Sequence, residues 1–83
     1  MNSSNLANET IQLPSILKVG FGSDAMQIDL SDGRVLSVPL AWYPKLAMAE
    51  RNQLQRFEIS PGGYGIHWPE LDEDLSVKGF LLP

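Results

Sequence analysis

The dipeptide Asp32-Gly33 constrains the fold more than any other feature of the sequence. Apolar and polar residues alternate over 25–30 before it and over 34–40 after it. Alternation with a period of two is typical of strands that are buried on one face. Asp-Gly suits a two-residue turn of the primed type, in which both residues take positive φ. We therefore predict an antiparallel hairpin with Asp32 and Gly33 as structural turn residues.

Two prolines mark the end of the second strand and the start of a helix. Pro39 has no N–H for a sheet ladder, so the strand is expected to end there or to lie at an edge. Pro44 is well placed at the first position of a helix, and good helix formers follow it as far as Leu54. The sequence predicts one short helix packed on the sheet.

A further strand is predicted before the hairpin, over residues 15–22. Leu17, Val19 and Phe21 alternate in it and are expected to face the core. The strands of the resulting three-stranded antiparallel meander are 15–22, 25–30 and 34–40.

The second half of the chain predicts a short hairpin from residues 56–59 and 66–68. The loop between them, 60–65, contains three glycines and a proline. Gly62 and Gly63 are predicted as structural turn residues, because glycine adopts positive φ freely.

The C-terminal stretch begins with acidic residues and ends with apolar ones. Residues 72–74 favour a helix start or an exposed turn. Ser76 is suited to cap a helical turn that reaches Leu81, and the apolar residues of that turn are expected to cover the core.

Length and composition indicate a single domain of the α+β class. We place it at residues 13–83, after a polar, mobile tail at residues 1–12. At 83 residues a core is small, so a homodimer is expected. The chain has no cysteine, which suits the reducing cytoplasm. We also expect no membrane span and no secretion signal, since no long apolar run is present.

The charge balance favours one class of partner over others. The net charge is −4, from ten acidic and six basic residues, and the basic residues are scattered. Binding of phosphate backbones needs a clustered basic surface, so direct nucleic-acid binding is not expected. An acidic chain attracts a small basic protein partner.

No residue pattern indicates catalysis, a metal or a cofactor. His67 with Asp72 and Asp74 lacks the spacing of known metal sites. The loop 60–65 lacks the lysine and hydroxyl residue of a phosphate-binding loop, and no serine lies in a nucleophile-elbow sequence. We therefore predict a non-enzymatic protein with no catalytic residue, no metal and no cofactor.

The aromatic residues allow two interpretations. Trp42 and Trp68 are each followed closely by a proline, and they can pack together as a seam between sheet and helix. In the alternative, aromatic and acidic side chains form a partner-binding surface, because Trp and Tyr dominate binding hot spots as well as small cores. The partner-binding residues of this alternative are Trp42, Tyr43, Trp68, Glu70, Asp72, Glu73 and Asp74.

Seven short motifs, taken in order and with their spacing, resemble the small bacterial family called domain of unknown function 2442. They are Asp32-Gly-Arg, Val38-Pro-Leu, Trp42-Tyr-Pro-Lys-Leu, Ala49 with Arg51, Gly65-Ile-His-Trp-Pro, Leu71-Asp-Glu-Asp and Leu81-Leu82. The resemblance covers about residues 15 to 82 and implies a compact α+β domain. Relatives are often encoded beside another small protein in an arrangement like a toxin–antitoxin pair, which implies an antitoxin-like role. The family supplies no catalytic residues.

Three functions remain open at the level of sequence. The preferred one is a non-enzymatic, antitoxin-like accessory protein that binds a small basic protein. The second is a small-ligand-binding or minimal enzyme domain with a pocket near His67 and Trp68. The third is a DNA-associated regulator that acts through a partner.

Overall fold

The computed structural model describes residues 12–82 and has two antiparallel sheets joined by short helices. The strands are β1 (Ile16–Phe21), β2 (Ala25–Leu30), β3 (Val35–Pro39), β4 (Glu58–Ile59), β5 (Gly65–Trp68) and β6 (Glu73–Ser76). The α-helices are α2 (Pro44–Ala47), α3 (Arg51–Leu54) and α4 (Val77–Leu81), and the 3-10 turns are η1 (Leu40–Trp42) and η2 (Pro61–Gly63). The predicted α+β class is confirmed.

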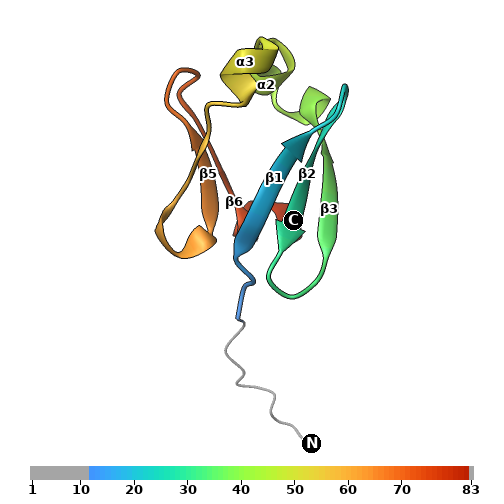
Figure 1. The fold of residues 1–83 in the computed structure, drawn as a ribbon, viewed down its shortest axis with the longest axis vertical. Coiled ribbons are helices and arrows are strands. Elements are labelled where there is room, and N and C mark those ends of the chain that lie inside the picture. The colour runs from blue at the N-terminus through green and yellow to red at the C-terminus, as the bar shows by residue number, and fades with distance from the viewer. Residues whose placement is uncertain (1–11, 83) are drawn as a thin grey trace, which may run out of the picture.

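Each sheet has three strands, in the order β1-β2-β3 and β4-β5-β6. The two sheets lie beside each other with the core between them, and α2 and α3 close one end of the arrangement (Figure 1). The first sheet is the predicted meander. Apart from Gln12, the predicted tail at residues 1–12 lies outside the described residues.

The predicted hairpin between β2 and β3 is present, but its turn has three residues and not two. The N–H of Gly33 donates to the carbonyl of Leu30 at 3.0 Å, and the N–H of Leu30 donates to the carbonyl of Arg34 at 2.9 Å. Gly33 has a φ of 94°, whereas Asp32 is not among the described residues with positive φ. The prediction that both turn residues take positive φ was therefore wrong, because a three-residue loop needs it only at its last position.

Asp32 stabilises the turn through its side chain. Its carboxylate accepts hydrogen bonds from the Arg34 guanidinium at 2.8 Å and from the Arg34 backbone N–H at 3.1 Å. These two bonds, the side-chain one first, lower the pKa of Asp32 below its usual value.

A β-bulge in β1 changes which side chains face the core. Ile16 pairs with Leu30 and Lys18 with Asp29, so Leu17 is the extra residue of the bulge. Ile16 is consequently buried and Leu17 is 66% exposed. The prediction that Leu17 faces the core was wrong, since one inserted residue moves a side chain to the other face.

The predicted helix begins at Pro44 as expected but is divided in two. Glu50 has an extended backbone, with φ −76° and ψ 158°, and it caps the start of α3. Its N–H donates to the side-chain oxygen of Gln53 at 2.9 Å, while its own side chain accepts from the Gln53 backbone. The extended backbone of Glu50 interrupts the predicted helix, and this reciprocal capping box starts α3.

The second hairpin is confirmed and is extended by a third strand that the sequence did not predict. Residues 72–74 were expected to form a helix start or an exposed turn; the turn is confirmed for Asp72, whereas Glu73 and Asp74 belong to β6, in which Asp74 pairs with His67 of β5. Asp72 occupies the turn between the strands with a φ of 51°. Gly62 and Gly63 take positive φ in the preceding loop, as predicted.

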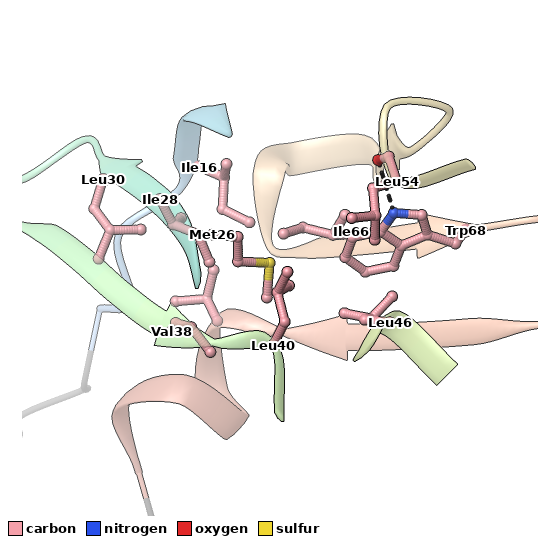
Figure 2. Close-up of a cluster of buried hydrophobic side chains, with 11 residues drawn as sticks. Ile16, Met26, Ile28, Leu30, Val38, Leu40, Leu46, Leu54, Ile66 and Trp68 are labelled. Carbon is pink, nitrogen blue, oxygen red and sulfur yellow. Dashed lines mark hydrogen bonds between the residues drawn. The ribbon is translucent and has the colours of Figure 1, made fainter. Parts of the chain in front are cut away.

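One apolar core fills the space between the sheets and includes side chains from both of them (Figure 2). Its buried members are Ile16, Met26, Ile28, Leu30, Val38, Leu40, Leu46, Leu54, Ile66, Trp68 and Val77. Ser76 caps α4 by accepting a hydrogen bond from the Gly79 N–H at 3.0 Å. The predicted C-terminal helical turn is confirmed, and its apolar residues pack on this core.

Candidate partner-binding groove

The two tryptophans lie in opposite environments. Trp68 is fully buried, whereas Trp42 is 69% exposed at the end of η1. Trp68 and His67 are neighbours in β5, so their side chains point to opposite faces of the sheet. The Trp68 side chain points into the core (Figure 2). The predicted core role therefore holds for Trp68 but not for Trp42, so the two rings do not form a common buried seam.

Trp42 lines a groove of about 280 Å³ between β3, η1 and α4. We call it the β3 groove. It is lined by Val35, Leu36, Ser37, Val38, Trp42, Tyr43, Gly79 and Phe80. Val35 is 55% exposed, and Leu36 and Phe80 are half-buried against the core. The groove thus presents an apolar wall to solvent, with no charged side chain among its lining residues.

A second hollow of about 310 Å³ continues the β3 groove, and we call it the acidic extension. It shares Tyr43, Gly79 and Phe80 with the groove and adds three residues of β6. Of these, Asp74 keeps 75% of its side chain exposed. Burial, and secondarily the negative charge of Glu73, raise the pKa of the Tyr43 hydroxyl above its usual value. The combined surface is apolar at one end and has one carboxylate, that of Asp74, among its lining residues at the other.

All four acidic residues of the predicted partner-binding surface contact groups of the chain itself, and the contact of Asp74 is with His67. Glu70 pairs with Arg56 at 2.5 Å, and Glu73 lies 3.9 Å from the Lys45 ammonium. The same ammonium donates to the backbone carbonyl of Asp72 at 2.8 Å. Glu70 and Asp72 line neither the β3 groove nor the acidic extension. Of the predicted residues, only Trp42, Tyr43 and Asp74 line the β3 groove or the acidic extension.

His67 borders a different hollow, of about 340 Å³, on the outer side of the second sheet. Its Nδ1 lies 2.6 Å from a carboxylate oxygen of Asp74, its cross-strand neighbour. Trp68 does not line this hollow, because successive side chains of a strand point to opposite faces. Within residues 12–82, no three histidine, aspartate or glutamate side chains lie close enough together to hold a metal ion.

Sequence reasoning missed the part that β3 and Phe80 play in this surface. Pro39 was the available signal, because a proline in a strand indicates an edge.

None of the helices in the described part of the chain is long and apolar enough to cross a membrane.

Comparison with known families gives one match. The family described as "Protein of unknown function (DUF2442)" matches residues 16–83. The match confirms the resemblance that the seven motifs predicted. No curated protein matches the chain.

Two solved structures are similar to the chain over most of its length. One is the crystal structure of a protein of unknown function from Rhodospirillum rubrum, with 33% identity and a TM-score of 0.73 over 84% of this chain and 87% of that one. The other is the solution structure of an uncharacterized protein from Chromobacterium violaceum, with 29% identity and a TM-score of 0.68. It matches 81% of this chain, which spans 63% of that protein. Neither protein is described as having a known activity.

Proposed function

Because the chain belongs to the family of proteins of unknown function DUF2442, whose description gives no activity, we propose its function from its surface. The protein is a non-enzymatic interaction module. Its β3 groove takes apolar side chains of a small basic protein, and its acidic extension takes a lysine or arginine of the same partner.

The observation that carries this proposal is the exposure of Trp42 inside a groove. A tryptophan that is 69% exposed leaves a large apolar area in water. Val35 and Phe80 line the same groove, so Trp42 belongs to a larger apolar surface. Exposed apolar surface of this kind marks interaction sites, and tryptophan is enriched among the residues that dominate binding energy.

Charge supports a basic partner. Asp74 lies in the acidic extension with most of its side chain exposed, and the chain carries a net charge of −4. Such a charge speeds the encounter with a positively charged protein and slows it with a negative one. We further propose that the role is antitoxin-like, as the family resemblance implies, and that it is exercised in the cytoplasm.

Selection from a random peptide library displayed on phage tests the proposal. We expect the selected peptides to combine apolar residues with lysine or arginine. Their affinity should fall about tenfold or more in Trp42→Ala, since hot-spot residues contribute at least that much. Met48→Ala is the matched control, because Met48 is also apolar and 85% exposed but does not line the groove.

Two results would contradict the proposal. One is a selection that yields no peptide binding more tightly than an unselected one. The other is an equal affinity for wild type and Trp42→Ala. Thermal unfolding of both variants checks that they remain folded, as expected for exposed side chains.

A further inference from the structure

We infer that the partner segment binds as an extended strand added to the outer edge of β3. This inference rests on the proposed function and states how the partner is held. Main-chain hydrogen bonds to β3 supply affinity that does not depend on sequence, and side chains that enter the groove supply specificity.

The hydrogen-bond pattern of the first sheet shows which groups point outward from β3. Leu30 bonds to Arg34, and the Leu40 N–H donates to the Asp24 carbonyl at 2.9 Å. In an antiparallel ladder the bonded pairs recur every two residues, so Leu36 also bonds to β2 through its pairing with Ile28. The intervening residues of β3 therefore direct their backbone groups away from β2.

The outward-directed groups are those of Val35, Ser37 and Pro39. Val35 and Ser37 each present an N–H and a carbonyl, and Pro39 presents only a carbonyl. β3 is the last strand in its sheet, and within residues 12–82 no other strand or loop pairs with these groups. An edge of this kind is a template for another strand.

The β3 groove lies along this edge and fits the side chains of an added strand. Alternate side chains of such a strand fall on the face that Leu36 and Val38 share. Trp42 and Phe80 line the groove next to these two residues. An apolar side chain placed there is covered on one side by the sheet and on the other by η1 and α4.

Charge decides between two occupants of the edge. A second copy of the chain also carries a net charge of −4, so it is repelled at long range. A basic segment is attracted, and Asp74, whose side chain contacts His67 and stays 75% exposed, lines the acidic extension next to Tyr43 and Phe80. The occupant is therefore an extended segment with an apolar residue and a nearby lysine or arginine.

Ser37→Pro tests the added strand directly. It removes an N–H that points away from β2, and proline is tolerated at such edge positions, so the first sheet should persist. We expect the affinity for the selected peptide to fall about tenfold or more, because backbone bonds are lost and a ring is inserted at the edge. Ser37→Ala keeps the backbone N–H and removes only the hydroxyl, so the difference in affinity between Ser37→Pro and Ser37→Ala isolates the contribution of the edge N–H and the ring.

A second measurement uses wild-type protein, so it does not depend on the folding of a variant. The selected peptide is N-methylated at one residue at a time. An added strand predicts that binding is lost at every second residue, because only alternate N–H groups face β3.

The outcomes separate this inference from the proposed function. If Trp42→Ala weakens binding while neither Ser37→Pro nor N-methylation does, the added strand is wrong and the interaction module stands. If Trp42→Ala also has no effect, the proposed function fails. If sedimentation shows a wild-type dimer that Ser37→Pro abolishes, a second copy occupies the edge and the inference is overturned.

Discussion

The indole Nε1–H of Trp68 donates a hydrogen bond to the backbone carbonyl of Leu54 at 3.1 Å inside the core (Figure 2). Leu54 is the last residue of α3, where helix carbonyls have no partner within the helix. A single buried side chain thus satisfies the end of a helix and ties that helix to β5. The bond explains why a tryptophan can be fully buried in so small a core.

We predict that Trp68→Phe lowers the free energy of unfolding by about 1–3 kcal/mol, since it leaves the buried Leu54 carbonyl without a donor. Urea unfolding followed by circular dichroism measures the change. Trp42→Phe is the matched control and should change stability by less than about 0.5 kcal/mol, because its side chain is exposed. Equal effects of the two substitutions would contradict the assignment of Trp68 to the core and Trp42 to the surface.

We predict that Gly33→Ala destabilises the first sheet by about 1–2 kcal/mol, the cost of holding a residue with a Cβ at positive φ. A Cβ at Gly33 meets nothing within 4 Å, so backbone strain alone is tested. Gly20→Ala is the control, because Gly20 is equally open and has no positive φ. It should be neutral or stabilising, since alanine restricts the unfolded chain. A loss of stability in Gly20→Ala equal to that in Gly33→Ala would contradict this explanation.

Local signals predicted the elements whose cause is local. The alternation of apolar and polar residues around Gly33 predicted β2 and β3, and Pro44 predicted the start of α2. Ser76 predicted the capped helical turn α4. In each case nearby residues determine the backbone conformation by themselves. The causes are the alternation of apolar and polar residues in a strand, the φ angle that the proline ring fixes, and the capping hydrogen bond of a serine side chain.

Features that depend on distant partners were not predicted. Glu73 and Asp74 disfavour a strand on propensity, yet β6 forms because β5 offers it a pairing edge. The Leu17 side chain is exposed because of a β-bulge, and this bulge is evident only from the pairing of β1 with β2. The exposure of Trp42 likewise follows from the path of η1, which buries Leu40 in the core and leaves Trp42 in solvent, and no local pattern predicts it.

We predict that alkaline pH destabilises the protein partly through Tyr43. The pKa of Tyr43 is raised in the folded state, so between the usual tyrosine pKa and the raised one the folded chain holds a proton that the unfolded chain has lost. The resulting stability is complete below about pH 10 and declines as the pH rises through the folded pKa. Urea unfolding from pH 8 upward should show a smaller decline in Tyr43→Phe than in wild type. Identical declines would show that Tyr43 does not contribute.

Asp72 and Asp74 were both predicted as partner-binding residues, but they have different surroundings in the structure. Asp72 lies in the β5–β6 turn with a φ of 51°, and Lys45 binds its carbonyl. Asp74 lines the acidic extension, and its carboxylate contacts His67. Asp72→Asn and Asp74→Asn remove the same charge two positions apart.

Asparagine tolerates the left-handed conformation, so Asp72→Asn should retain both stability and affinity for the selected peptide. Asp72→Val should lose about 1–2 kcal/mol of stability, because a β-branched residue is strained at that φ. Asp74→Asn should weaken binding, and the difference from wild type should shrink as salt is added. Titration calorimetry at two salt concentrations measures both affinities. Equal losses in Asp72→Asn and Asp74→Asn would mean that overall charge, and not the placement of Asp74 beside the groove, attracts the partner.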